Sequence, residues 1–380
     1  MQVGSLLPHV DPDGLLEYSV VFTDRSLNHM SKTFQKVMKD ISTGLKKAYN
    51  AEAVIVIPGG GTYGMEAIAR QFATQKNCLV IRNGWFSYRW TQILDQGSIA
   101  QNTAVIKATR NRDNQQEPFA PPDIKTVIDK ISSEKPNVVF APHVETSSGM
   151  LLPDDYLRKV AAATHDVGGI FVLDCVASGA LWVDMVDTGV DVLLSAPQKG
   201  WSSSPCSGLV MLSVRAKNLI GKTQSTSYVC DLLKWLQIME AYEAGGHAYH
   251  TTMPTDSLVK FRDTLLETEK YGFEKIRTEQ INLGKKVREV LETRGFKSVA
   301  SKPFQSPSVV VSYTDNPDIK NGKLFAEKGV QIAAGVPLEC DEGENFMTFR
   351  IGLFGLDKLH NPKRTVSSLK EALDAIQSGN

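Results

Sequence analysis

One lysine stands at the junction between an apolar run and a string of small residues in the segment LLSAPQKGWSSSPCSG, residues 193–208. Lys199 follows residues typical of the end of a buried strand and precedes Gly200 and several serines typical of a tight loop. A surface lysine at a strand end and a partly desolvated amine both fit this pattern. Burial would lower the pKa of the amine and free its neutral form to make a Schiff base.

An acidic residue ends another apolar run, IFVLDCVAS, residues 170–178. Asp174 lies where a buried strand would stop, and a lone buried carboxylate is costly unless it has a partner. A structural salt bridge or a helix cap would supply that partner. The cationic ring nitrogen of a bound cofactor would supply it equally well.

Three glycines separate an expected strand from an expected helix in IPGGGTYGMEAIA, residues 57–69. Gly59, Gly60 and Gly61 would let the backbone approach an anion, and Thr62 adds a hydroxyl. The N–H groups and the positive dipole end of the helix would favour a phosphate. The segment lacks the GK[ST] ending of a Walker loop and a convincing GxGxxG pattern. An ordinary strand–helix turn therefore stays open beside a single-phosphate cradle.

These features follow one another in the order glycine loop, acid and lysine, each at the carboxyl end of an expected strand. Open α/β sheets bind ligands at that edge. Pyridoxal 5'-phosphate needs an amine to bind its aldehyde, an acid to keep its ring nitrogen protonated, and a phosphate site. The three features together therefore predict this cofactor, with Lys199 and Asp174 as its catalytic partners.

Apolar runs rich in valine and isoleucine alternate with helix-like segments over the first two thirds of the chain. Such alternation predicts an α/β fold, a large domain whose mainly parallel sheet is covered by helices. The expected strands are residues 53–58, 78–84, 103–108, 137–146, 170–176, 191–197 and 208–214. The expected helices are residues 65–73, 89–97, 122–134 and 153–168.

The character of the sequence changes near Pro254. A long, charged helical stretch is followed by the strand-like segments PSVVVSY and MTFRIGLFG and a helix-like C-terminus. We expect an irregular N-terminal segment over residues 1–20, packed on the small domain or on a partner. A large cofactor-binding domain over 21–254 and a small α+β domain over 255–380 complete the expected organisation.

The bulk composition excludes several function classes. The 380 residues carry 42 basic and 42 acidic side chains, so nothing indicates binding to nucleic acid or to a membrane surface. The five cysteines show no CxxC pair, and no histidine lies at a metal-ligand spacing, so we expect no metal site. We read the cysteines as reduced thiols of a cytoplasmic protein. The N-terminus lacks a signal-peptide pattern, and no apolar run is long enough to span a bilayer.

From about residue 50 to its end, the chain resembles the class V aminotransferases of the fold-type I pyridoxal-phosphate superfamily, in the alanine–glyoxylate and serine–pyruvate aminotransferase group. The resemblance rests on HVETSSGMLLP, LDCVAS, SAPQKG and FRIGLFG taken as a set. It implies that Lys199 is the Schiff-base lysine that also shuttles a proton, and that Asp174 pairs with the pyridine nitrogen.

The resemblance also implies the remaining cofactor contacts. Gly60, Gly61, Thr62 and Gln198 would hold the phosphate. Phe86 would stack on the ring, with Trp85 as the neighbouring candidate, and Val176 would press the opposite face. Ser147 would hydrogen-bond the ring hydroxyl. A core role stays open for Phe86 and Val176.

Further expectations concern substrate and assembly. Arg350, in FRIGLFG, matches the arginine that clamps the substrate carboxylate, a task suited to guanidinium. Tyr249 and Thr252, in AYHTTMP, match a motif that reaches the phosphate of the other subunit, which implies a homodimer with shared active sites.

Two segments depart from the family pattern near the expected substrate pocket. The usual glycine-proline-glycine turn near the N-terminus is replaced by VDPDGLLEYSVVF, which holds Asp11 and Asp13. After the lysine, the common Pro-Pro-Gly ending reads Pro-Cys-Ser-Gly at residues 205–208. The sequence therefore leaves the amino donor open, together with any role of Tyr18 or Arg25 in the pocket.

We expect an aminotransferase that moves an amino group from a small amino acid to a small 2-oxo acid of the pyruvate or glyoxylate type, with ping-pong kinetics. A pyridoxal-phosphate lyase or cysteine desulfurase on the same fold is the alternative, with Cys340 as the cysteine in the C-terminal half. A catalytically silent homologue is a third reading, which the joint presence of lysine, aspartate and arginine disfavours.

Overall fold

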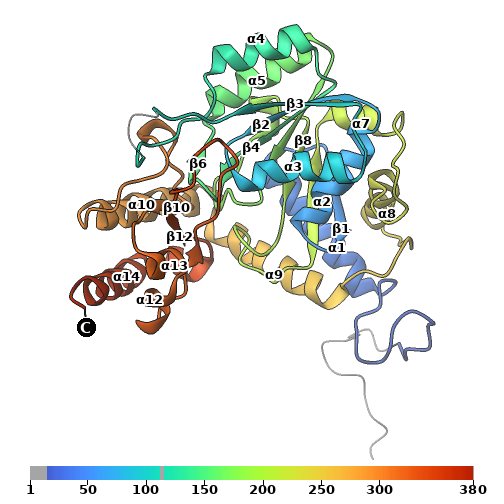
Figure 1. The fold of residues 1–380 in the computed structure, drawn as a ribbon. Helices are drawn as coiled ribbons and strands as arrows, with labels where there is room; N and C mark the ends of the chain where they lie inside the picture. The colour runs from blue at the N-terminus through green and yellow to red at the C-terminus, as the bar shows by residue number, and fades with distance from the viewer. Residues whose placement is uncertain (1–14, 112–114, 380) are drawn as a thin grey trace, which may run out of the picture.

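A computed structural model describes residues 15–111 and 115–379 of the chain (Figure 1). Most of the expected N-terminal segment, with Asp11 and Asp13, lies outside these residues. In the described part of the chain, no helix is both long and apolar enough to cross a membrane.

A seven-stranded sheet forms the centre of the larger part of the molecule, in the strand order β1-β9-β8-β7-β4-β2-β3. Its strands are β1 (Ala53–Pro58), β2 (Asn77–Arg82), β3 (Asn102–Lys107), β4 (Val138–Pro142), β7 (Ile170–Asp174), β8 (Val192–Ser195) and β9 (Ser207–Leu212). The five strands from β3 to β8 run parallel, whereas β9 runs antiparallel to both β1 and β8. The predicted mainly parallel α/β sheet is confirmed.

Helices cover both faces of this sheet. Figure 1 shows α4 (Ile124–Glu134) and α5 (Asp154–Asp166) along one side, and α2 (Gly61–Ile68), α3 (Trp85–Gln96) and α1 (Lys32–Tyr49) on the other. A π-helical turn, Ala69–Ala73, continues α2, so the predicted helix at 65–73 begins earlier than expected. The remaining elements of this part are α6 (Met185–Thr188), α7 (Val214–Ile220), α8 (Leu232–Glu243) and the short strands β5 (Val144–Glu145) and β6 (Met150–Leu151).

Helix α1 was not among the predicted elements, although its sequence carries the usual signals. The hydroxyl of Ser31 accepts a hydrogen bond from the Phe34 backbone and so caps the helix. Buried apolar residues then recur at helical spacing, including Phe34, Val37, Met38, Ile41 and Leu45. This face packs against the sheet and against α8 and α9.

The long helical stretch expected after Pro254 is two helices, α9 (Thr255–Tyr271) and α10 (Phe273–Glu292). Gly272 divides them with a φ of 104°, a conformation that side chains other than hydrogen rarely allow. Helix α9 packs on α1, whereas α10 packs on β10 and α14. The chain therefore passes from the large sheet to the second one at this glycine.

The C-terminal part holds a three-stranded antiparallel sheet in the order β10-β12-β11. Its strands are β10 (Val309–Tyr313), β11 (Ala333–Ala334) and β12 (Thr348–Gly352). The helices around it are α11 (Pro317–Lys320), α12 (Lys323–Glu327), α13 (Leu356–His360) and α14 (Pro362–Gln377), and a 3-10 turn spans Lys302–Phe304. Figure 1 shows this part beside the carboxyl ends of the parallel strands.

Candidate active site

Lys199 lies in the turn that follows β8, half-buried at the carboxyl edge of the large sheet. Burial lowers the pKa of its ammonium group, and the nearby Arg350 charge acts in the same direction, while the Asp174 carboxylate opposes both. A lower pKa leaves more of the amine in its neutral, nucleophilic form at neutral pH.

Asp174 is the last residue of β7 and pairs in register with Leu194 of β8. This pairing fixes the acid at the same edge of the sheet as Lys199. Its Oδ1 accepts a hydrogen bond of 2.9 Å from the Val176 backbone N–H. Burial raises the pKa of the carboxyl group to about 6, although the Val176 hydrogen bond and the Lys199 charge lower it. A cation placed against this carboxylate would restore its ionised form.

The ring of Phe86 lies between three cationic side chains. Its centroid is 5.7 Å from the Lys199 Nζ, 5.6 Å from the Arg350 Cζ and 5.1 Å from the Arg89 Cζ. Phe86 stands in the first turn of α3, and Arg350 reaches the site from β12 of the second sheet. The Arg350 Nε donates to the Ala334 carbonyl at 2.8 Å, which fixes the guanidinium beside the ring.

A buried carboxylate, Glu145, holds the start of α3 in place. It accepts hydrogen bonds from the backbone N–H groups of Phe86 and Ser87 at 3.2 and 2.9 Å, and from the Ser87 hydroxyl at 2.7 Å. It also accepts from the backbone N–H and hydroxyl of Ser147, at 3.1 and 2.7 Å. A negative charge at a helix N-terminus is favourable. Glu145 therefore sets the position of Phe86.

The predicted glycine loop leads into the N-terminus of α2. Gly59 has a φ of 121°, and a side chain on it would collide with the Tyr63 ring. A Cβ at Gly61 would lie 3.0 Å from Val176, so glycine lets α2 approach the segment after β7 closely. A Cβ at Gly60 would meet nothing within 4 Å, so this side of the loop is open. The arrangement suits an anion at the helix N-terminus.

One cavity joins most of the predicted cofactor residues. Its lining includes Gly61, Thr62, Phe86, Asp174, Val176, Gln198 and Lys199. Two buried polar atoms on its wall, the Thr146 Oγ1 and the Gln198 Oε1, have no hydrogen-bond partner within the described residues. Buried polar atoms are normally hydrogen-bonded. A polar ligand with hydrogen-bonding groups on two sides would complete them, and pyridoxal phosphate fits that requirement.

Four predicted cofactor residues are absent from the cavity lining: Gly60, Ser147, Tyr249 and Thr252. The Ser147 hydroxyl is not on the cavity wall; it donates to Glu145 and accepts from the Trp85 backbone N–H at 2.9 Å, and Thr146 faces the cavity instead. Tyr249 and Thr252 are hydrogen-bonded to each other at 3.1 Å, and neither lines the Lys199 cavity.

Four other residues considered from the sequence do not contribute to the cavity. Trp85, the neighbouring candidate for stacking, is absent from the cavity lining, as are Tyr18 and Arg25 in the described part of the chain. The Cys340 thiol is buried against the Arg82 carbonyl, and burial raises its pKa to about 12. A catalytic thiol needs a lowered pKa and access to substrate, so Cys340 does not suit the desulfurase alternative.

Sequence reasoning missed Arg89, Glu145 and Thr146. Arg89 lies on the cavity wall and donates to the Thr62 hydroxyl at 3.0 Å. It stands one helical turn after Phe86, and this spacing is a signal that could have found it. No cluster of three or more residues suited to holding a metal ion occurs in the described ranges.

Comparisons with known proteins find named aminotransferases that align with most of this chain. The alanine–glyoxylate aminotransferase of Felis catus is 26% identical over 359 residues, covering 91% of this chain and 82% of that protein. This chain is similar to the class V aminotransferases over most of its length. The alanine–glyoxylate aminotransferase 1 of Saccharomyces cerevisiae is 29% identical over 268 residues, or 66% of each chain. A protein of Synechococcus sp. named as the small subunit of a soluble hydrogenase is 23% identical over 353 residues, covering 92% of this chain and 86% of that protein.

Solved structures show the same fold for this chain. The alanine–glyoxylate aminotransferase of Nostoc sp. superposes with a TM-score of 0.76 at 21% identity, covering 91% of this chain and 89% of that one. A search against models of protein families finds none that matches the chain.

Proposed function

We propose that this aminotransferase uses pyridoxal phosphate to move an amino group between a small amino acid and a small 2-oxo acid. The convergence of Lys199, Asp174 and Phe86 on one cavity carries the proposal. Relatives named alanine–glyoxylate aminotransferase and 2-aminoethylphosphonate–pyruvate transaminase support small substrates, with glyoxylate or pyruvate as the acceptor type.

The cavity would hold the cofactor by contacts of four kinds. Gly60, Gly61 and Thr62 at the start of α2, with Gln198, would bind the phosphate. Phe86 and Val176 would enclose the ring from its two faces. Asp174 would pair with the ring nitrogen, and Thr146 is better placed than Ser147 to meet a polar group on the ring. When bound, pyridoxal phosphate supplies an aldehyde that takes up the amino group and a ring that delocalises electrons.

The protein's own groups would then divide the remaining work. Lys199 would release its amine, accept the proton from the substrate α-carbon and later return a proton as a general acid. Asp174 would stabilise the protonated ring nitrogen by its negative charge. Arg350, held by the Ala334 carbonyl, would bind the substrate carboxylate through two parallel hydrogen bonds.

We also infer a homodimer with shared active sites. Large apolar side chains are exposed near the described N-terminus, including Leu15, Leu16, Tyr18 and Val20, and Tyr249 is 53% exposed. Clustered exposed apolar side chains favour a protein partner, and a second copy of the same chain is the commonest one. The five cysteines are all free, which supports a reducing, cytoplasmic location.

An absorbance spectrum of the purified protein, recorded after single amino acids are added, tests the proposed function. We expect a band near the visible edge that one small donor removes and that pyruvate or glyoxylate restores. A band that no donor changes, or the release of ammonia or sulfide, would contradict amino transfer and favour a lyase.

A further inference from the structure

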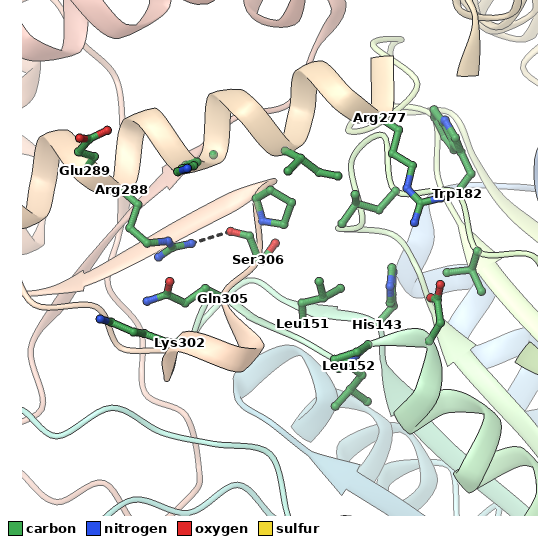
Figure 2. Close-up of a pocket in the computed structure, with 18 of the residues that line it drawn as sticks. His143, Leu151, Leu152, Trp182, Arg277, Arg288, Glu289, Lys302, Gln305 and Ser306 are labelled. Carbon is green, nitrogen blue, oxygen red and sulfur yellow. Dashed lines mark hydrogen bonds between the residues drawn. The ribbon is translucent and has the colours of Figure 1, made fainter. Parts of the chain in front are cut away.

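A second cavity, the α10 cleft, lies between helix α10 and the segments that follow β4, β6 and β7 (Figure 2). Its volume is about 720 Å³, larger than that of the Lys199 cavity, and the two share no lining residue. A cleft of this size takes a ligand as large as a typical small organic molecule. The proposed aminotransferase chemistry makes no use of it.

Arg288 is a buried cation on the wall of the α10 cleft, only 9% exposed. Its guanidinium donates to the Ser306 carbonyl at 2.7 Å and to the Ser298 hydroxyl at 3.3 Å, both neutral groups. It forms no ion pair with any acid of the described residues. Burial lowers its pKa to about 10, against a weaker opposite effect of Glu292. A buried charge that forms no ion pair is costly, and an anion in the cleft would lower that cost.

Two further donors lie beside Arg288. Figure 2 shows Gln305 and Lys302 next to the Arg288 guanidinium on one side of the cleft. Lys302 is exposed, so it can follow a ligand's charge without any rearrangement of the fold. Glu289 is also on the lining, and Figure 2 shows its carboxylate directed away from Gln305 and Lys302. Glu292, the other acid at this end, is exposed. This end of the cleft therefore suits an anionic group.

The cleft also has apolar walls. Leu151, Leu181, Trp182, Ile281 and Pro307 contribute to its walls. Figure 2 shows Arg277 near Trp182 and His143 at the end of the cleft away from Arg288, and Asp154 is also on the lining. Arg277 precedes Arg288 by three turns of α10, which is about 16 Å along the helix. A ligand held at Arg288 would therefore lay an apolar body against these walls.

We propose that the α10 cleft binds an amphipathic organic anion, with its carboxylate, sulfonate or phosphate at Arg288 and Lys302 and its apolar body along Leu151, Leu181 and Ile281. The site is separate from the amino-transfer cavity, so the proposal does not depend on which reaction the Lys199 cavity performs. The ligand class follows from the charge at one end and the apolar walls.

Anilinonaphthalene sulfonate, a fluorescent aromatic anion, tests the proposal on the cofactor-loaded enzyme. We expect one saturable binding event per chain, which added salt weakens because it screens the ion pair. Lys302→Glu should weaken binding about tenfold or more, since it replaces an attraction with a repulsion. Lys286→Glu, on the exposed face of α10 and away from the cleft lining, makes the same charge change and should leave binding intact.

A second pair of variants tests the apolar body. Ile281, 46% exposed on α10, tolerates a polar replacement, and Ile281→Glu should also weaken binding of the probe. Val214→Glu, at a similarly exposed helical site outside the cleft, should not. Absence of saturable binding would overturn the proposal. So would equal affinities of the wild type and Lys302→Glu, or equal losses in the Lys302 and Lys286 variants.

Discussion

The Lys199 cavity and the α10 cleft both place a cation in a partly buried site, but they differ in what offsets its charge. Lys199 is opposed by Asp174, and the two groups shift each other's pKa. Among the described residues, Arg288 donates hydrogen bonds to two neutral oxygens and forms no ion pair. A reacting group needs neighbours that tune its protonation, whereas a group that only recognises an anion can leave its charge for the ligand to neutralise.

The two regions also differ in how they are built. The walls of the Lys199 cavity come from α2, from α3 and from segments that follow strands of one sheet. The sheet register fixes Asp174 and the start of the Lys199 turn together. The cleft forms where α10 faces several separate segments of the large sheet's periphery. The position of Asp174 relative to Lys199 is therefore set within one sheet, whereas the cleft depends on how the C-terminal part packs.

The largest expected effect is the loss of turnover when Lys199 in the Lys199 cavity is replaced. Lys199→Ala removes both the nucleophile and the proton carrier, so turnover should fall about 10³-fold or more. Lys222→Ala, an exposed lysine outside both sites, is the matched control and should retain full activity. Steady-state rates with a small amino donor measure the difference. Turnover by Lys199→Ala near the wild-type rate would contradict its role.

Asp174→Asn should lower turnover about a hundredfold, the size usual for losing one electrostatic partner of a reacting group. In the cofactor-free protein, by contrast, the same substitution should stabilise the fold. Because the folded pKa of about 6 lies above the ordinary value of 3.8, ionisation of Asp174 opposes folding above pH 6 and not below pH 4. The variant should therefore gain about 1–3 kcal/mol at pH 8 and lose this gain near pH 4.

Thermal unfolding at the two pH values, with the wild type beside the variant, measures this dependence. A stability gain of equal size at pH 4 and pH 8 would show that the buried charge is not its cause.

Glu145→Gln tests whether Glu145 holds the start of α3, and with it Phe86, in place at the Lys199 cavity. All the groups around the carboxylate are donors, so the new amide NH₂ would face donors and leave hydrogen bonds unmade. We expect a loss of about 2–4 kcal/mol in the free energy of unfolding. Glu134→Gln breaks an exposed ion pair with Lys130 and should cost about 0.5 kcal/mol or less. Chemical denaturation measures the free energy of unfolding of both variants. Equal losses in the two would refute the positioning role of Glu145.

The smallest expected effect concerns the second site. Lys302→Glu, the variant that should weaken probe binding in the cleft about tenfold or more, should leave kcat/KM for amino transfer within about twofold of the wild type when no cleft ligand is present. Such a result would keep the two regions functionally separate. A loss comparable to that of Asp174→Asn would instead make the cleft part of the reaction.

The sequence predicted the parts of this molecule that depend on local pattern. Continuous apolar runs identified the strands, and the polar residues after them, Asp174 and Lys199, lie at one edge because parallel strands end together. The register of a short loop was less predictable. Ser147 and Thr146 are consecutive residues whose side chains point to opposite sides of the chain. The Ser147 hydroxyl is hydrogen-bonded to Glu145, and Thr146 lines the cavity.

Contacts between segments far apart in the chain could not be predicted from the sequence. Arg288 looks like any arginine on a charged helix, and its burial depends on residues 298–306, which fold back against α10. Helix α1 was missed for a different reason. Its cap and apolar spacing are local and readable, but it carries no residue that the chemistry needed.

The most direct test of amino transfer counts product in a half-reaction. The enzyme, loaded with its cofactor, is mixed with excess amino donor and no 2-oxo acid acceptor, and the keto acid formed is measured against the concentration of chains. Transfer to a cofactor held at Lys199 predicts one keto acid per chain, no free ammonia, and further product only after pyruvate or glyoxylate is added. Continued formation of keto acid with an equal amount of ammonia would contradict the account.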